Sequence, residues 1–328
     1  MIKVGLWGCG GISPSHRRAY QKLEEMGVDV KLVALCDINP ESFNKEVKIN
    51  IQGDDAPLKK IEHCYTDADE MFENEELDMV DICLPAFLHK DAAIKALQRG
   101  VNVLCEKPMA MTTEECREML EVEKKSKARL MIAQCVRFET VSDWLKCAIE
   151  NKTYGEVISA DFSRISALPA WRFTKGKEYT SRHDGVIFDM HLHDVDLVNY
   201  LFGEPDEVFA TSSNKFTFCD SVSTIFKYKN KTVSIRGDWG YPQSYPFSAT
   251  WQVNFENGCA VLDKDEKITL YTDEKQETVN LTNLDSFASE IKYFVEIIRD
   301  NLENTKNPPE GTVKTMELID RIEEIAIG

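Results

Sequence analysis

Several features are missing from this 328-residue sequence, and each absence removes a class of protein. No stretch approaches the run of about 20 apolar residues that a membrane-spanning helix needs. The amino-terminal segment IKVGLWG has no basic start, apolar stretch and small-residue cleavage site. Tracts rich in Pro, Gly and Ser are also absent, so the whole chain should fold. We therefore expect a cytoplasmic protein without a membrane partner.

Positive charge is scarce. The chain has 39 Lys and Arg against 56 Asp and Glu, which gives a formal net charge of −17. This charge opposes approach to phosphate backbones and to anionic lipid surfaces. Nucleic acid is therefore not expected as a partner.

The ten cysteines contain no CxxC pair and no regular spacing, so neither a zinc site nor a redox motif is indicated. Several lie in apolar runs such as VALCD, DICLP and VLCEK, where a thiol behaves as a small hydrophobe. We expect reduced thiols, most of them buried, as in a cytoplasm.

The length indicates two domains. Short apolar runs such as IKVGLW, VKLVALCD, MVDICLP and VNVLCEKP alternate with helical patterns in the first third of the chain. This alternation is typical of βαβ units on a parallel sheet. Gly27 and Gly100 stand where a left-handed residue ends a helix, and Thr112 and Glu115 have the spacing of a capping box. A short strand is expected near Tyr65.

After about residue 130 the pattern changes to longer strand-like runs, beginning with RLMIAQCVRF and joined by turn-like Lys-Asn and Asn-Gly pairs, which favour antiparallel hairpins. We expect a helix at about 186–202 and two closing helices at about 285–302 and 312–327. The predicted fold is α/β. We expect residues 1–120 to form a Rossmann dinucleotide-binding domain and residues 121–328 to form an α+β domain with a large, mainly antiparallel open sheet.

The segment GCGGIS, which follows the first predicted strand, resembles a dinucleotide fingerprint. Its glycines permit a tight turn and a close approach of backbone N–H groups to a pyrophosphate. Ser13 stands where the fingerprint has Gly or Ala; because Pro14 follows, Ser13 fits a helix N-cap. The candidate cofactor-binding residues of this turn are Gly8, Gly10, Gly11 and Ile12.

Asp37 ends the second predicted strand, VKLVALCD. A carboxylate there can accept hydrogen bonds from both ribose hydroxyls of an adenosine and would repel a 2′-phosphate, which favours NAD over NADP. The alternative is an aspartate that only caps the turn at Asn39.

Glu106 and Lys107 follow the predicted buried strand VNVLC, and ligands bind outside the carboxyl ends of such strands. Lys107 is either a solvated loop residue or a proton donor beside the nicotinamide. Since a proline follows it, its backbone is restricted to an extended conformation. Pro85 and His89, in LPAFLH after the preceding strand, should line the same crevice.

The predicted helix at 186–202 carries an unusual polar face. Asp189, His193 and Asp196 have the i, i+4 and i+7 spacing of one helix face. In one interpretation His193 is a general base, Asp189 orients a substrate and Asp196 supports the imidazole. Alternatively, Asp189 and His193 form a structural ion pair, or a set including His191 binds a metal. Because His191 points away from this face, we predict no metal.

Together the segments GLWGCGGIS, LPAFLH, CEKP and DMHLHDVD, in this order, resemble the Gfo/Idh/MocA oxidoreductases, the family of glucose-fructose oxidoreductase and inositol 2-dehydrogenase. The resemblance covers essentially the whole chain, including the E-xxx-F pattern of Glu290 and Phe294. It implies NAD-dependent hydride transfer at a hydroxyl-bearing carbon of a polyol, sugar, cyclitol or sugar derivative. It also implies that Lys107 and His193 handle the hydroxyl proton and Asp189 positions the substrate.

The same resemblance implies a homodimer or homotetramer that associates through the sheet of the second domain. Many members have Gly-Gly where this chain has Asp184-Gly185, and the segment around Trp171 and Arg172 is individual. The candidate substrate-binding residues are Trp171, Arg172, Asp189 and His193. Two alternatives stay open: an NAD-dependent glycosidase of the same fold, and a cofactor-binding regulator without turnover, against which the retained Lys107, Asp189 and His193 argue.

Overall fold

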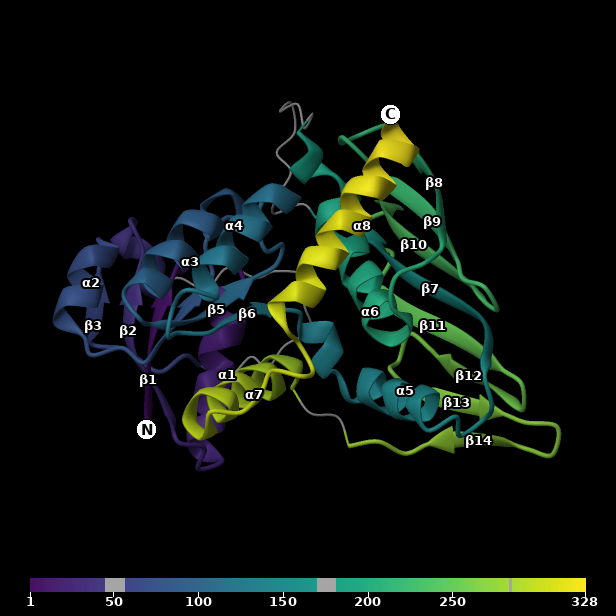
Figure 1. Ribbon diagram of the computed structural model, residues 1–328, viewed down its shortest axis with the longest axis horizontal. Helices are drawn as coiled ribbons and strands as arrows, with labels where there is room; N and C mark the ends of the chain where they lie inside the picture. The colour runs from purple at the N-terminus through teal and green to yellow at the C-terminus, as the bar shows by residue number, and fades with distance from the viewer. Residues whose placement is uncertain (45–56, 170–180, 283–284) are drawn as a thin grey trace. The chain divides into compact units, whose positions relative to one another are not determined.

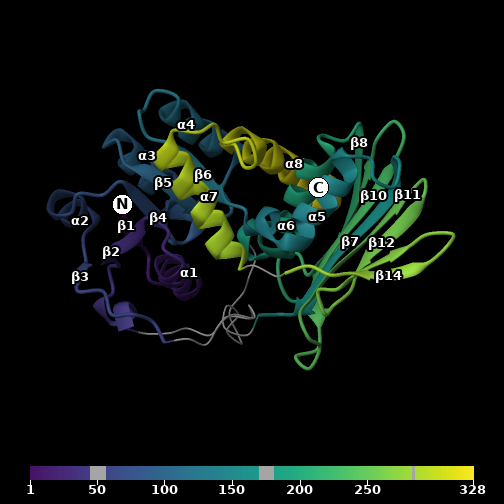
Figure 2. The same ribbon diagram turned by 90° about the horizontal axis from the view of Figure 1, so that it is seen from below.

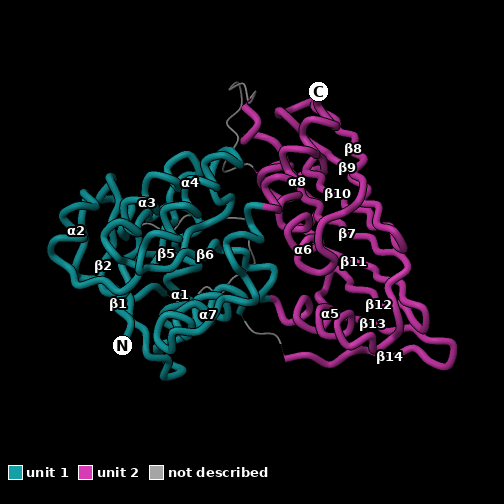
Figure 3. The backbone as a smooth tube through the Cα atoms, in the orientation of Figure 1, with its two compact units in different colours: residues 1–138, 284–313 teal, residues 139–283, 314–328 magenta. Residues whose placement is uncertain are grey.

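The computed structural model describes residues 1–44, 57–169, 181–282 and 285–328. The chain forms two compact units, drawn in different colours in Figure 3. Unit 1 contains residues 1–138 and 284–313, and unit 2 contains residues 139–283 and 314–328. The sequence suggested a single division at residue 120. The chain instead leaves unit 1 after residue 138 and later returns to it.

Unit 1 is built on a six-stranded parallel sheet with the order β3-β2-β1-β4-β5-β6. Its strands are β1 (Ile2–Trp7), β2 (Val30–Cys36), β3 (His63–Tyr65), β4 (Met79–Ile82), β5 (Asn102–Glu106) and β6 (Leu130–Ala133). β6 belongs to the run RLMIAQCVRF, which the sequence pattern assigned to the second domain. That assignment is wrong, because Val103 of β5 pairs in register with Leu130 of β6.

Helices cover the sheet of unit 1. They are α1 (Ser13–Glu25), α2 (Ala68–Asn74), α3 (His89–Gln98), α4 (Thr113–Glu123) and α7 (Ser286–Asp300). α7 lies alongside α1 (Figure 1), and its Ile291 and Phe294 are fully buried in a core shared with β1, β2 and α1. Burial of these apolar side chains of α7 explains why a segment that is distant in sequence belongs to unit 1. Gly27 and Gly100 have positive φ angles, and the Thr112 side chain caps α4, as expected.

Unit 2 contains an eight-stranded sheet with the order β14-β13-β12-β11-β7-β10-β9-β8. Its strands are β7 (Val157–Ala167), β8 (Glu207–Ser213), β9 (Ser221–Lys227), β10 (Thr232–Tyr241), β11 (Ser248–Phe255), β12 (Gly258–Leu262), β13 (Ile268–Tyr271) and β14 (Gln276–Val279). The central pair β7 and β10 is parallel, and the other pairs are antiparallel. The mainly antiparallel sheet is therefore confirmed.

One face of this sheet carries the helices of unit 2. α5 (Thr140–Glu150), α6 (Leu192–Phe202) and the carboxyl-terminal part of α8 (Pro309–Ile327) lie on it, as Figure 2 shows. In the described part of unit 2 the other face carries no helix. There Phe209 of β8 and Ile225 of β9 are direct cross-strand partners and are 50% and 46% exposed.

Among the described residues, we find no helix that combines the length and the apolar composition needed to cross a membrane.

Candidate active site

The predicted cofactor residues gather at one edge of the parallel sheet in unit 1. Its strand order changes direction between β1 and β4, and ligands of open α/β sheets bind outside the carboxyl ends of the strands at such a point. At or just after the ends of β1, β2, β4 and β5 lie Gly8, Gly10, Gly11, Ile12, Asp37, Pro85, His89, Glu106 and Lys107.

Gly8 and Gly10 serve the glycine turn in different ways. Gly8 has a φ angle of +102°, and a Cβ atom there would lie 2.6 Å from the carbonyl oxygen of Cys83. The fold itself therefore requires glycine at this position. Gly10 is exposed, and a Cβ atom there would meet no described atom within 4 Å. The space above Gly10 is open to a ligand, which is the geometry that a bound pyrophosphate needs.

The start of α1 differs from the prediction. Ser13 is the first helical residue, Ile12 is the N-cap, and no side chain caps the helix. The prediction that Ser13 caps the helix is wrong, because its hydroxyl donates a hydrogen bond to the carbonyl oxygen of Gly10 at 3.0 Å. Pro14 has no backbone N–H, and that of Ser15 donates to the Ile12 carbonyl oxygen at 3.0 Å, so the N–H groups of the glycine turn and of Ser13 are the candidate donors to an anion. These donors fit the pyrophosphate of a dinucleotide.

Asp37 is half-buried directly after β2. One carboxylate oxygen accepts a hydrogen bond from the backbone N–H of Cys9 and the other from that of Asn39. It therefore forms the turn cap considered from the sequence and also contacts the glycine turn. A carboxylate can accept about four hydrogen bonds, so further lone pairs remain for ribose hydroxyls.

Two exposed apolar side chains at this edge were missed from the sequence. Ile38, next to Asp37, is 89% exposed, and Phe87, two residues after the exposed Pro85, is 65% exposed. Apolar surface of this kind suits packing against a flat ring. For Ile38 the signal in the sequence was its position as an apolar residue directly after Asp37.

Glu106 and Lys107 are held by contacts within unit 1. Glu106 is buried and accepts a hydrogen bond from the backbone N–H of Lys107 at 3.0 Å, while the Lys107 side chain is half-buried. The ring nitrogens of His89 lie 2.8 Å from the carbonyl oxygens of Pro108 and Leu84. His89 therefore ties the loop after β4 to the loop that carries Lys107. Burial lowers the pKa of His89, while its contacts with the two carbonyl oxygens act in the opposite direction.

A second histidine beneath this edge, His16 of α1, was not selected from the sequence. Its ring lies between the carboxylates of Asp81 in β4 and Glu106 in β5. The groups of His16, Asp81 and Cys83 that could ligate a metal lie within 4.8 Å of one another. Direct hydrogen bonds among them account for this proximity. Only tertiary structure brings these side chains together, so no local pattern could reveal the cluster.

The other predicted catalytic residues lie in unit 2. Asp189 is in a π-helical turn (Ile187–His191), and His193 is in the first turn of α6. Both side chains are half-buried. The sequence pattern predicted a regular α-helix here, and the π turn is an irregularity of the kind often found at functional sites.

The polar neighbours of His193 have separate partners. Asp194 accepts two hydrogen bonds from the Arg164 guanidinium in β7, and Asp196 accepts one from the Thr315 hydroxyl in α8. His191 is fully buried, and its Nε2 atom lies 2.8 Å from Thr224 Oγ1 in β9. His191 therefore points to the sheet, as expected from the helix geometry.

Trp171 and Arg172, the remaining predicted substrate-binding residues, lie outside the described residues.

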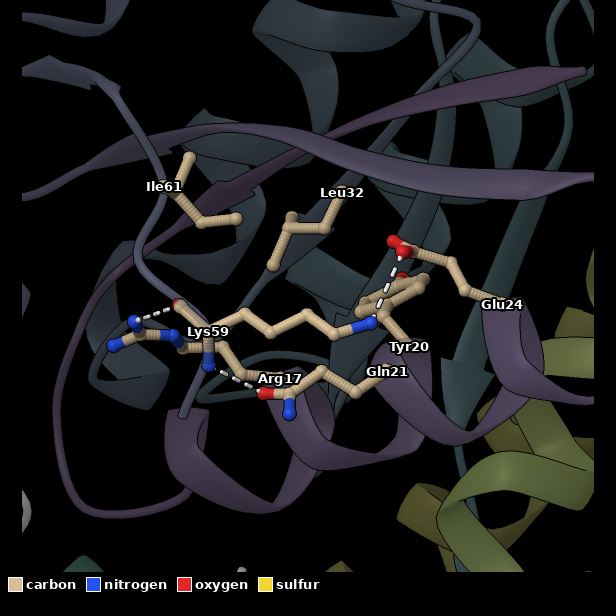
Figure 4. Close-up of a pocket in the computed structure, with 7 residues that line it drawn as sticks. All are labelled: Arg17, Tyr20, Gln21, Glu24, Leu32, Lys59 and Ile61. Carbon is tan, nitrogen blue, oxygen red and sulfur yellow. Dashed lines mark hydrogen bonds and ion pairs between the residues drawn. The ribbon is translucent and has the colours of Figure 1, made fainter. Parts of the chain in front are cut away.

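A cavity in unit 1 lies away from the glycine turn, between α1 and the segment after residue 57 (Figure 4). Its volume is about 20 Å³, which is enough for about one water molecule. Arg17 donates hydrogen bonds to the carbonyl oxygens of Phe43 and Lys59, and Gln21 accepts one from Lys59 N–H. These contacts fasten a loop to α1, and the cavity is too small for a dinucleotide.

Comparison with known proteins adds independent evidence. A family model described as "Oxidoreductase family, NAD-binding Rossmann fold" matches residues 2–134, and one described as "GFO/IDH/MocA C-terminal domain" matches residues 143–261. An alignment of 333 positions with the inositol 2-dehydrogenase of Rhizobium meliloti has 26% identity and covers 94% of this chain and 92% of that protein.

An alignment of 243 positions with the D-apiose dehydrogenase of Paraburkholderia graminis has 27% identity and covers 73% of this chain but only 60% of that relative's length. Among solved structures, a levoglucosan dehydrogenase in complex with NADH and levoglucosan has a TM-score of 0.84 at 19% identity, with 99% of this chain and 97% of that chain covered. At this identity the structural likeness establishes the fold.

Proposed function

Since the chain belongs to the Gfo/Idh/MocA oxidoreductase family, we propose that it is an NAD(H)-dependent oxidoreductase. It transfers a hydride between the cofactor and a hydroxyl-bearing carbon of a sugar, cyclitol or sugar derivative. The observation that carries the proposal is the carboxyl edge of the unit 1 sheet. Neighbouring strands there present an open glycine turn, an acid after β2 and a half-buried lysine after β5.

The residues present fit a dinucleotide. The N–H groups of the glycine turn and of Ser13 bind the pyrophosphate, Asp37 binds the adenosine ribose, and Ile38 and Phe87 offer apolar surface to the adenine. NAD is favoured over NADP because the Asp37 carboxylate repels a 2′-phosphate. Pro85, His89 and Glu106 shape the loops beside the nicotinamide. When bound, NAD supplies the hydride acceptor.

Three side chains act on the substrate. The amine of Lys107 and the imidazole of His193 can each hold the proton that leaves the substrate hydroxyl as the C–H hydride departs. The Asp189 carboxylate accepts hydrogen bonds from substrate hydroxyls and thereby orients the reacting carbon. Removal of the hydroxyl proton is what makes hydride loss from that carbon favourable.

We also propose that the protein is a homodimer or homotetramer in the cytoplasm. The face of the unit 2 sheet on which no described helix lies supports self-association, because Phe209 and Ile225 together leave apolar surface exposed on adjacent strands. All ten cysteines are described and none is in a disulfide, as is common in a reducing compartment. Light scattering of the wild type and of Phe209→Glu tests the association.

The decisive experiment incubates the protein with NAD and a panel of sugars, sugar phosphates and cyclitols while NADH absorbance is followed. We expect at least one member to reduce NAD, and activity to persist in EDTA. Conversion of a glycoside without net NADH would point instead to the transient oxidation of a glycosidase. Tight NAD binding without conversion of any substrate in either direction would indicate a regulator.

A further inference from the structure

The side chain of His16 in α1 contacts two strands of the parallel sheet. Its Nδ1 atom lies 2.8 Å from Asp81 Oδ2 in β4, and its Nε2 atom lies 2.9 Å from Glu106 Oε1 in β5. His16 and Asp81 are fully buried, and Glu106 is 8% exposed. The imidazole therefore links one helix to two adjacent strands in a site closed to bulk water.

The carboxylates of Asp81 and Glu106 favour the protonated form of the His16 ring. Both ring nitrogens face carboxylate oxygens, and only the imidazolium carries a proton on each nitrogen. Burial is the largest single effect and lowers the pKa of His16, but the charges of Asp81 and Cys83 and the hydrogen bonds to both side chains together outweigh it, so the pKa is raised well above its usual value. The other titratable groups around this cluster are the Tyr20 hydroxyl, which donates to Asp81 at 2.9 Å, Cys83 and, farther away on α7, Glu290.

Glu106 connects His16 to Lys107 through its two carboxylate oxygens. While Oε1 of Glu106 meets His16, Oε2 accepts the backbone N–H of Lys107 at 3.0 Å. Each carboxylate oxygen thus has a separate partner, and the rotamer of Glu106 is fixed from both sides. Glu106 is the last residue of β5, so its bond to the Lys107 N–H constrains the backbone where the chain leaves the sheet.

We propose that His16 is a positioning residue that orients Lys107 through Glu106, as a protonated link between Asp81 and Glu106. The proposal rests on the proposed function, in which Lys107 holds the substrate proton. Without the cation, two buried carboxylates face each other without compensating charge, and Glu106 turns toward solvent and releases the Lys107 N–H. His16 itself touches neither substrate nor cofactor in this role.

The test compares His16→Gln and Asp81→Asn with the wild type. Glutamine cannot donate from both ends of its amide, so one carboxylate loses its donor. We expect kcat to fall about 10-fold to 100-fold in His16→Gln, the usual effect of disturbing a supporting residue. KM and NAD affinity should stay near wild-type values. In Asp81→Asn the pKa of His16 falls, so a new decline of kcat toward high pH should appear.

Two NMR measurements test the contact of His16 with Glu106 and of Glu106 with Lys107, and neither requires catalytic activity. With ¹⁵N-histidine, the His16 signals, assigned by their loss in His16→Gln, should be those of an imidazolium at neutral pH. With ¹⁵N-lysine, the Lys107 backbone amide, assigned by its loss in Lys107→Met, should move upfield in both variants as its carboxylate acceptor is released. His63→Gln, at an exposed histidine that contacts Glu75, is the control and should change neither.

A neutral His16 in the wild type overturns the proposal, as does a folded His16→Gln protein with an unshifted Lys107 amide. A lower melting temperature with unchanged kcat would make His16 purely structural. If His16→Gln does not fold, the amide shift and pH profile of Asp81→Asn decide the question. If the wild type oxidises no substrate, the proposed function fails, while the NMR measurements still test the link itself.

Discussion

The carboxylate of Asp37 accepts a hydrogen bond from the backbone N–H of Cys9 at 2.7 Å, although 28 residues separate the two. The end of β2 is thereby tied to the middle of the glycine turn. Its other oxygen accepts the N–H of Asn39 at 2.8 Å. Asp37 therefore shapes the turn and also presents negative charge where the adenosine ribose of a dinucleotide would lie.

Asp37→Ala should narrow the preference for NAD over NADP, because the variant can neither bind the ribose diol nor repel a 2′-phosphate. Affinity for both cofactors should also fall, since the Cys9 N–H loses its acceptor. Calorimetric titration of the two cofactors measures both effects. Asp29→Ala is the matched control, since Asp29 precedes β2 as Asp37 follows it, and its preference should equal that of the wild type. An unchanged NAD-to-NADP ratio in Asp37→Ala would make Asp37 only a turn cap.

Substitutions at two glycines of the same turn should separate folding from cofactor binding. Gly8→Ala places a Cβ atom 2.6 Å from a backbone oxygen at a positive φ angle, so it should destabilise the protein by about 1–3 kcal/mol. Gly10→Ala meets no described atom within 4 Å, so its melting temperature should match that of the wild type while NAD binding weakens. Thermal melts and NAD titrations distinguish the two. Wild-type NAD affinity in Gly10→Ala would show that no ligand approaches this position.

The parts of the fold that could be predicted are those encoded by local patterns. Apolar runs that alternate with helical segments predicted the parallel sheet, and turn residues such as Gly27 predicted helix ends that the structure confirms. The sequence could not predict that β6 and α7 belong to unit 1. The local sequence pattern of a strand or a helix does not show which sheet it joins or packs against. Only the register between β5 and β6 and the burial of Phe294 decide it.

The candidate site divides in the same way. Gly8, Asp37 and Lys107 could be selected because each follows a recognisable strand. His16 could not, because its two carboxylate partners lie 65 and 90 residues away and carry no local signal. The π turn that holds Asp189 was equally hidden, since its i, i+4 spacing is compatible with a regular α-helix.

Lys107→Met and His193→Ala should each lower turnover by about 10²-fold to 10⁴-fold, the usual contribution of a positioned acid or base. NAD affinity should stay close to that of the wild type, because the pyrophosphate and the ribose are assigned to the glycine turn and Asp37, whereas the Lys107 amine and the His193 imidazole are assigned to the substrate proton. Steady-state kinetics and NAD titration measure the two quantities. Lys90→Met, on α3 in unit 1, is the control for the lysine and should retain activity.

Thermal stability distinguishes catalysis from a structural ion pair of Asp189 and His193. The half-buried His193 should be removable with little change in melting temperature. An active, folded His193→Ala protein would contradict the catalytic role. A strongly destabilised one would support the structural ion pair.

The fully buried His191 should make the protein acid-sensitive. Burial lowers the pKa of its imidazole to about 3, whereas the unfolded chain has an ordinary value of about 6.5. Between these pH values the unfolded state binds a proton that the folded state does not, so the free energy of unfolding falls as pH drops from about 6.5 to about 3. His191→Gln should melt lower than the wild type at neutral pH, because the buried contact with Thr224 is disturbed, but should lose less further stability on acidification. Melting temperatures measured at a series of pH values test this prediction, with the exposed His63→Gln as the control. If the melting temperatures of the wild type and of His191→Gln fall equally on acidification, the prediction is contradicted.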